Sequence, residues 1–416
     1  MNLRTPVLWG TLFLFWSHGL AAEGPGADWP SFRGPERSGL AGPSGLRAPW
    51  PEAGLQPLWS RPLGEGYSAV SVAEGRLYTL YAEGEKEYLV SLDPADGHTL
   101  WQVELGQKVQ TEFGNGPRST PAVAGDTVYA VGSDLVLRAV ATADGKERWR
   151  VDLGKEFGAQ PPRWGFATSP LVDGDLVLLE VGGGEGKGIA ALDAATGKTR
   201  WTALNSRTSY GSPIAVTLGG VRQYITAPSG APQVVGLSTT GEVLWSHEWS
   251  SGTIAMPLLV DGDKVFVSAS EDVGGMLFQV RQVEGKFTTE ELWRNREMKN
   301  HFSSTLVYGG YLYGFDGATL KCLDAATGER KWVKRGFGKG SLIAADDHLL
   351  VLTDRGQLVL VEATPEEYRQ AGSFPVLEDK TWTAPVLAAG KLYLRDHAKL
   401  VCFDVTAGGA QAGGAS

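Results

Sequence analysis

A ten-residue motif recurs along this chain and constrains its fold more than any other feature of the sequence. The clearest copies read LDPADGHTLW at 92–101, LDAATGKTRW at 192–201 and LDAATGERKW at 323–332. In each copy the Asp can accept backbone N–H bonds in a turn, and the Gly can take a positive φ that other residues resist. Alternation along the following strand then places the Trp on one face. The motif therefore predicts a β-hairpin whose second strand presents a Trp.

The spacing of the motif predicts how these hairpins are grouped. A second hairpin precedes the motif, as in TPAVAGDTVY at 120–129. The Trp residues at the equivalent position of successive units, from Trp59 to Trp332, lie 39 to 52 residues apart. Four-stranded units of about 40–50 residues are typical of β-propeller blades. Since no segment shows a sustained helical period with caps, we expect few helices.

The two ends of the repeat region predict that the ring is closed. Seven complete units end near Phe374, and an eighth begins at Thr383 but stops after Asp404 without its last strand. The stretch PLWSRPL at 57–63 looks like a last strand that lacks its three partners. If this strand completes the eighth unit, no sheet edge is left open there. We therefore expect residues 57–405 to form an all-β, eight-bladed propeller of four-stranded antiparallel blades.

The segments outside the propeller predict export. Residues 1–22 combine Arg4, an apolar run of about ten residues and small residues at the end, which is the order of a secretory signal peptide. No Cys follows the run, so we expect a periplasmic or extracellular monomer with no lipid anchor and no transmembrane segment. Residues 23–56 form an extended arm that either plugs the channel or lies along its rim. Residues 406–416, made of Thr, Ala, Gly, Gln and Ser, are predicted to be disordered.

Composition excludes several classes of function. The formal net charge of −9 argues against a nucleic-acid partner, because such binders need a basic surplus. Two Cys residues cannot form a disulfide scaffold or a four-thiolate zinc site. The six His residues show no paired spacing, so no metal site is expected. No nucleophile motif occurs, and no catalytic residue is assigned.

The repeats resemble the pyrroloquinoline-quinone-like (PQQ-like) β-propeller family over residues 57–404. Its blade signature, Ala/Cys-Leu-Asp-x-x-Thr-Gly-x-x-x-Trp, is matched at 191–201 and 322–332. Members include the propeller subunit of the outer-membrane protein assembly machinery (BamB-like) and the quinoprotein dehydrogenases. The resemblance implies that the recurring Trp residues dock adjacent blades. These are Trp59, Trp101, Trp149, Trp201, Trp245, Trp293 and Trp332.

The propeller topology predicts a binding site at one mouth of the channel. Loops that enter the inner strands carry 12 Lys or Arg against seven Asp or Glu, whereas the turns on the opposite face collect Asp. The residues expected to ring the mouth are Tyr67, Arg118, Arg163, Trp164, Tyr210, Asn300, His301, Lys339 and Trp382. Cations mixed with aromatic rings in a concave site favour a small anionic, partly planar ligand. The alternative is that these side chains only fill the funnel and pair with neighbouring loops.

Two functions are consistent with the resemblance. The first is a non-catalytic scaffold in the cell envelope, with an envelope or secreted protein as partner and no cofactor. The alternative is a quinone-linked alcohol or sugar dehydrogenase, which would need PQQ with calcium, and in which Trp164 or Trp382 would stack on the quinone. Such enzymes commonly carry adjacent cysteines, but Cys322 and Cys402 are expected a whole blade apart, too far to bond. We therefore expect the scaffold.

Overall fold

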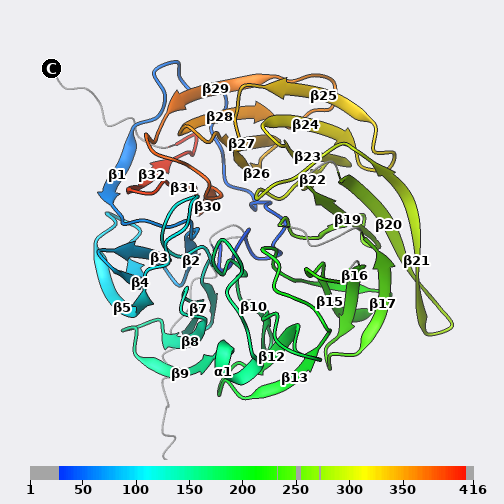
Figure 1. Cartoon of the computed structure of the whole chain (residues 1–416). Coiled ribbons are helices and arrows are strands. Elements are labelled where there is room, and N and C mark those ends of the chain that lie inside the picture. Colours follow the sequence, from blue (N-terminus) through cyan, green and yellow to red (C-terminus); the bar gives the residue numbers. More distant parts are fainter. Residues whose placement is uncertain (1–27, 232, 250–253, 271–272, 409–416) are drawn as a thin grey trace, which may run out of the picture.

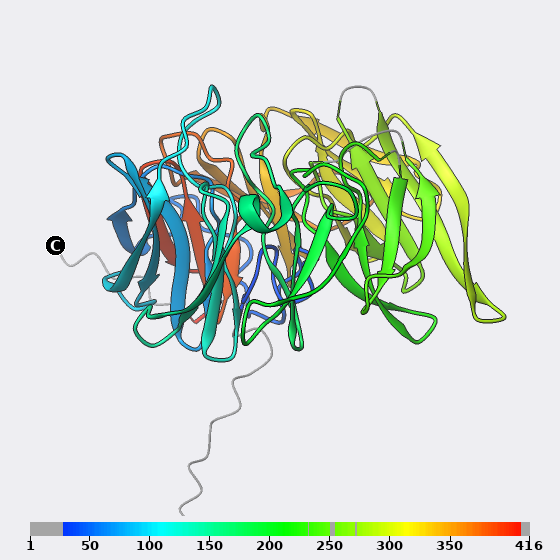
Figure 2. The same cartoon turned by 60° about the horizontal axis from the view of Figure 1, so that its bottom comes forward.

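The structure is a computed structural model that describes residues 28–408 except 232, 250–253 and 271–272. The predicted signal peptide and residues 409–416 lie outside the described residues. The described chain forms eight four-stranded sheets around a central axis, with one short helix, α1 (Leu153–Phe157) (Figures 1 and 2). Neighbouring strands within the sheets pair antiparallel throughout, so the predicted eight-bladed all-β fold is confirmed.

The blades are numbered from 1 to 8 in chain order, with strands given innermost first. Blade 1 contains β2 (Ser71–Ala73), β3 (Arg76–Glu83), β4 (Lys86–Leu92) and β5 (Thr99–Gln107). Blade 2 contains β6 (Ala122–Ala124), β7 (Thr127–Val131), β8 (Val136–Ala141) and β9 (Glu147–Asp152). Blade 3 contains β10 (Leu171–Asp173), β11 (Leu176–Glu180), β12 (Ile189–Asp193) and β13 (Thr199–Ala203). Blade 4 contains β14 (Ile214–Leu218), β15 (Val221–Thr226), β16 (Gln233–Ser238) and β17 (Val243–Glu248). Blade 5 contains β18 (Leu258–Val260), β19 (Lys264–Ala269), β20 (Gly274–Val283) and β21 (Lys286–Asn295). Blade 6 contains β22 (Leu306–Tyr308), β23 (Tyr311–Asp316), β24 (Thr319–Asp324) and β25 (Arg330–Arg335). Blade 7 contains β26 (Ser341–Ala345), β27 (His348–Leu352), β28 (Gln357–Glu362) and β29 (Gln370–Pro375). Blade 8 contains β30 (Val386–Ala388), β31 (Lys391–Arg395), β32 (Lys399–Asp404) and β1 (Pro57–Pro62).

The N-terminal strand closes the ring. β1 pairs antiparallel with β32, with Trp59 opposite Cys402 and Ser60 opposite Val401. Figure 1 shows β1, in blue, completing the sheet that the red C-terminal strands begin. Because the first and last strands share one sheet, unfolding either terminus opens the whole ring.

An outer belt of Trp side chains lies between neighbouring blades. On outer strands such as β25 the alternation leaves Trp332 as the only buried residue. The Trp101 indole N–H donates to Thr142 O of blade 2 at 2.8 Å, and a Cβ on Gly145 of the same turn would lie 2.7 Å from the ring. The motif Gly is therefore required twice, for its φ of 72° and for its missing side chain. Equivalent bonds join Trp59 to Pro94, Trp149 to Ala194, Trp201 to Thr239, Trp293 to Ala325 and Trp332 to Thr364.

Trp245 departs from this belt. Its indole N–H donates to Gln223 Oε1 of its own blade at 2.7 Å, while its ring packs edge-on against Phe278 of blade 5, with the ring centroids 5.7 Å apart. Blade 5 has no motif turn to accept the bond, because β20 and β21 are ten residues each and turn only at Glu284 and Gly285. The inter-blade hydrogen bond expected of Trp245 is therefore absent, although the contact between blades remains.

An inner belt of hydroxyls joins the residues that precede the innermost strands. Ala69 N donates to Thr120 Oγ1 at 3.0 Å, Thr120 N to Ser169 Oγ at 2.9 Å, and Ser169 N to Ser212 Oγ at 2.9 Å. Met256 N likewise donates to Ser304 Oγ at 3.0 Å. These bonds tie together the starts of the inner strands of blades 1 to 4, and those of blades 5 and 6.

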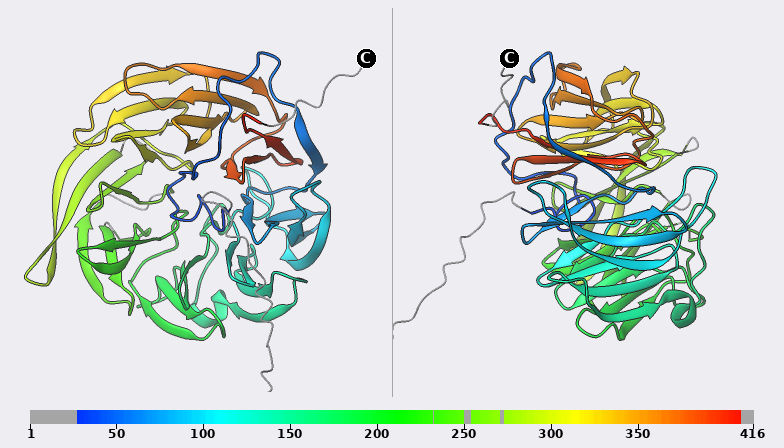
Figure 3. Two further views of the ribbon diagram at one scale, coloured as in Figure 1. Left: turned by 180° about the vertical axis from the view of Figure 1, so that it is seen from behind. Right: turned by 90° about the vertical axis from the view of Figure 1, so that its left-hand side faces the viewer.

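The arm plugs the channel. Trp29 forms a bridge with Val72 of β2, and Pro30 O accepts a bond from Val123 N of β6 at 2.8 Å. Across the channel, Leu40 forms a parallel bridge with Ala344 of β26. Figure 3, seen from behind, shows this dark blue segment inside the ring and its continuation to the outer edge. Of the two placements left open by the sequence, the arm takes the channel for residues 28–40.

The rest of the arm returns to the outer edge between blades 7 and 8. Asp346 accepts bonds from Ser44 N, Ser44 Oγ and Leu46 N. Trp50 packs edge-on against Phe374, which stands where blade 7 would carry its motif Trp, with centroids 5.4 Å apart. Leu46 also forms a bridge with Thr406, so the paired chain extends past the predicted boundary at residue 405.

Candidate functional site

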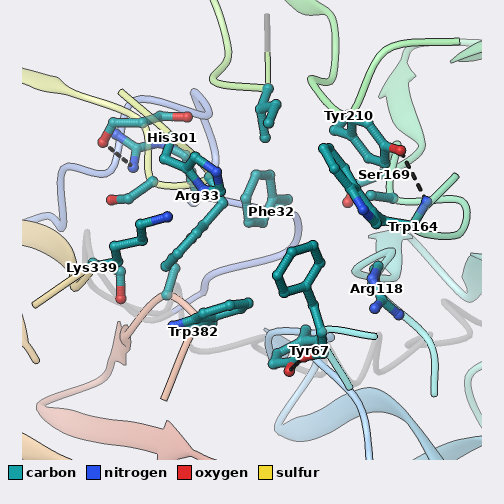
Figure 4. A pocket seen from close by; sticks show the side chains of 18 residues that line it. Phe32, Arg33, Tyr67, Arg118, Trp164, Ser169, Tyr210, His301, Lys339 and Trp382 are labelled. Atoms are coloured by element: carbon teal, nitrogen blue, oxygen red, sulfur yellow. Dashed lines mark hydrogen bonds between the residues drawn. The ribbon is translucent and has the colours of Figure 1, made fainter. Parts of the chain in front are cut away.

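A cavity of about 360 Å³ opens on the face where loops enter the inner strands. Every blade contributes to it through residues that directly precede its innermost strand. The arm supplies Phe32 and Arg33 at its base (Figure 4). Because the arm fills the channel behind these two residues, the cavity is a blind recess and not a pore.

Aromatic rings make most of the wall. The ring centroids of Trp164 and Tyr210 lie 5.2 Å apart, the Tyr210 hydroxyl accepts a bond from Trp164 N at 3.0 Å, and the indole Nε1 donates to Glu112 Oε1 at 3.0 Å. On the other side, Trp382 stacks on Tyr67 with centroids 5.7 Å apart. Each indole is thus held by hydrogen bonds or stacking before any ligand arrives.

Three cations line the cavity. Arg33 donates to Ser304 O and Thr305 O at 3.2 and 2.9 Å, and burial lowers the pKa of its guanidinium to about 10, which leaves it charged at neutral pH. Arg118 lies 5.2 Å from the centre of the Tyr67 ring, and burial lowers its pKa as well. Lys339 is the third. Among the described residues, none of the three cations has a carboxylate oxygen within 4.0 Å, whereas ion pairs of that length are common on the outer strands and turns.

Seven of the nine residues predicted to ring the channel mouth line this cavity: Tyr67, Arg118, Trp164, Tyr210, His301, Lys339 and Trp382. The other two do not. The Arg163 side chain is 74% exposed and pairs with Glu112 Oε1 at 3.0 Å outside the rim. Asn300 is 1% exposed, and its side chain bonds to Thr305 Oγ1 and Phe315 O of blade 6 at 2.8 Å each.

The repeat pattern gave no indication of the residues that the arm and the loops bring to the cavity. Phe32 and Arg33 come from an arm without a repeating pattern, and Phe113 and Phe302 come from loops. Phe113 bridges the two indoles, with its ring 5.7 Å from Trp164 and 6.2 Å from Trp382. The presence of two Arg and two aromatic residues within 29–37 was the available signal for the arm.

The acidic turns on the opposite face are largely paired. Asp126 binds Arg148 at 2.6 Å, and Asp175 binds Arg200. Asp173 binds the guanidinium of Arg222 at 2.7 Å. The negative face expected from the sequence is therefore largely compensated by Arg148 and Arg200 of outer strands and by Arg222 of β15, whereas the cations of the cavity have no carboxylate partner among the described residues.

The side chains around the cavity do not fit a calcium-bound quinone. Calcium is held by about six to eight oxygens, with carboxylates prominent among them. No described residue that lines the cavity is an Asp or Glu, and the described part of the chain holds no group of three or more His, Cys, Asp or Glu that could bind a metal. Cys322 and Cys402 are buried in β24 and β32, outside the lining, and burial raises the pKa of each thiol to about 12. The lining suits binding of an anion better than acid–base or nucleophilic chemistry.

Comparison with known proteins places the chain among propellers. The sequence model described as "Outer membrane protein assembly factor BamB" matches residues 53–161 and 85–334, more than half of the chain. No curated protein matches the sequence. Across the described residues, no helix has the length and apolar character needed to cross a membrane.

Three solved structures share the fold. BamB from Moraxella catarrhalis is 14% identical, with a TM-score of 0.64, covering 86% of this chain and 99% of its own. A europium-containing methanol dehydrogenase is 13% identical, with a TM-score of 0.65, covering 88% and 89%. The computationally designed Ika8 protein is 12% identical, with a TM-score of 0.59, covering 84% and 100%. At these identities the likeness establishes the fold alone.

Proposed function

Because this chain belongs to the family of the outer membrane protein assembly factor BamB, we propose that it is an exported, non-catalytic propeller that acts as a protein-interaction scaffold in the cell envelope. Residues 1–22 direct export in this proposal, and the mature chain works as a monomer without a lipid anchor. The partner is an envelope or secreted protein that docks on the face containing the cavity.

One observation carries the proposal. The channel is blocked by the chain's own arm, and the remaining recess is lined by aromatic rings and cations without a carboxylate among its described residues. Aromatic and Arg side chains in a recess are the residue types that carry most of the binding energy at protein interfaces. The inner belt of hydroxyls links the segments that line this face in neighbouring blades, and such preorganisation lowers the entropy cost of binding.

Site-specific photocrosslinking tests the scaffold. A benzophenone amino acid replaces Phe113, which is 42% exposed at the rim, in the full chain with its leader. The matched control replaces Val243, which is 55% exposed on the outer strand β17. We expect one envelope protein to crosslink at position 113 and not at 243. Equal labelling at both positions, or no protein adduct at 113, would contradict the proposal.

The dehydrogenase alternative has its own test. The purified protein is reconstituted with PQQ and calcium, then examined for bound cofactor absorbance and dye-linked alcohol oxidation. The donor set around the cavity predicts neither. Turnover under these conditions would overturn the scaffold as the main function.

A further inference from the structure

The three cations around the cavity differ in how far the protein already uses their donors. The Arg118 guanidinium is hydrogen-bonded within its own loop. Its Nη1 donates to Gly116 O at 2.9 Å, and its Nη2 donates to Thr111 Oγ1 and Gly114 O at 2.8 and 2.9 Å. The Arg33 guanidinium donates hydrogen bonds to the backbone carbonyls of Ser304, Thr305 and Ser38. These bonds use three of the five N–H donors of each guanidinium, and both side chains contribute positive potential.

Lys339 is different. Its backbone N–H donates to Asp354 Oδ2 at 3.1 Å, which fixes the loop before β26, yet its ammonium has no hydrogen-bond or ion-pair partner among the described residues. Figure 4 shows the side chain directed into the cavity from the side that also holds Arg33 and His301. An ammonium offers three donors, and this half-buried one lies at the wall of the cavity, where an anion can accept from it.

The shape of the recess limits what can reach that ammonium. A cavity of about 360 Å³ lies at the lower end of small-molecule sites, which span about 300–1,000 Å³. A protein partner buries about 800 Å² of surface on each side, so it would dock across the wider face around the cavity and leave the depth of the recess to a small molecule. Opposite Lys339 the wall consists of Trp164 and Tyr210, with Phe32 between the two sides. A ligand therefore meets the Lys339 ammonium on one side and, on the other, aromatic rings beside Arg118, whose guanidinium already bonds to its own loop.

We propose that the cavity is a metal-independent binding site for a small organic monoanion, with one carboxylate on Lys339 and a ring-sized apolar body between the aromatic side chains. The carboxylate is assigned to Lys339 because both guanidiniums already bond to acceptors of the protein, whereas the Lys339 ammonium has no such partner among the described residues. No cation is needed, because the anion is neutralised by Lys339 and by the field of Arg33 and Arg118. This ligand site goes beyond the scaffold function and does not depend on a protein partner.

Isothermal titration calorimetry on the purified full-length mature protein tests the site with 2-naphthoate as the probe. Its neutral analogue 2-naphthalenemethanol is expected to bind about tenfold more weakly, because it lacks the charge-assisted bond. Naphthalene-2,6-dicarboxylate is also expected to bind more weakly, because its second carboxylate must lose water against aromatic rings. EDTA and calcium are expected to leave naphthoate binding unchanged.

Variants assign the effect to one side chain. Lys339→Gln is expected to lower the affinity for naphthoate about tenfold and leave the neutral analogue unaffected, whereas Lys339→Arg retains most of the affinity. Arg335→Gln, an exposed position at the end of the same strand-to-strand connection, serves as the control and is expected to change nothing. Melting temperatures of the variants confirm that each is folded.

Several results would overturn the assignment. These are equal affinity for the acid and the alcohol, an unchanged affinity in Lys339→Gln, tighter binding of the dicarboxylate, or a requirement for calcium. Tighter binding of the dipeptide acetyl-Glu-Phe-amide than of naphthoate would assign the recess to a segment of a partner protein. Because the assay contains no partner, loss of naphthoate binding and loss of the crosslink at position 113 report on separate proposals.

Discussion

The contact between the motif Gly of one blade and the motif Trp of the preceding blade predicts a specific energetic coupling. Gly197 has a φ of 71°, and a Cβ on it would lie 2.6 Å from Cε3 of Trp149. Gly197→Ala should therefore lose about 1–2 kcal/mol to the left-handed backbone and about 1–3 kcal/mol more to overpacking against the indole. Gly174→Ala is the control, since that turn Gly has a φ of 60° and nothing within 4 Å of its Cβ position.

A double-mutant cycle separates the two costs. Trp149→Ala alone should cost about 3 kcal/mol, at the low end for a large aromatic because its ring is only partly buried. In the Trp149→Ala background the overpacking disappears, so adding Gly197→Ala should cost only the backbone term. The free energies of unfolding are measured by urea denaturation followed by circular dichroism. Additive single and double variants, or equal losses for Gly197→Ala and Gly174→Ala, would refute the docking role of this pair.

Two further predictions concern the arm and the leader. Burial raises the pKa of Asp346, but hydrogen bonds from Leu46 N and from Ser44 outweigh it, so the pKa lies below its ordinary value. The carboxylate therefore stabilises the fold above the unfolded pKa of about 3.9 and loses that effect as the pH falls through the folded pKa. The difference in the free energy of unfolding between the parent and Asp346→Asn should accordingly narrow between pH 5 and pH 3. A constant difference would contradict the attachment of the arm through the Asp346 carboxylate. A fusion of residues 1–22 to a phosphatase that is active only after export should show phosphatase activity. An inactive fusion would contradict the predicted signal peptide.

The repeat architecture was predictable because it is encoded locally. Each motif specifies its own turn through an Asp and a Gly, and the pairing of β1 with β32 follows from counting strands. The Trp contacts also follow from the repeat, except at Trp245, where the neighbouring blade lost its turn to the long β20–β21 hairpin.

The details of the cavity were not encoded in this way. Arg163 and Trp164 lie in a turn, and Asn300 and His301 lie at the start of a bend, where no regular alternation applies. In each pair only one member lines the recess. Which member does so depends on the loop conformation. The arm has no periodic pattern, and Phe32 reaches the cavity only because neighbouring segments pair with blades 1, 2 and 7. These placements are tertiary and cannot be counted from spacing.

Hydrogen exchange of the intact mature protein tests the central claim, that β1 closes the ring and the arm closes the channel. The paired N–H groups of β1 and of Trp29 and Ala41 are predicted to exchange far more slowly than those of exposed loops, because they bond to β32, Val72 and Ala344 in the closed structure. Rapid exchange of residues 57–62 while β31 stays protected would mean that the ring is open. Rapid exchange of residues 28–41 would mean that the recess has no floor.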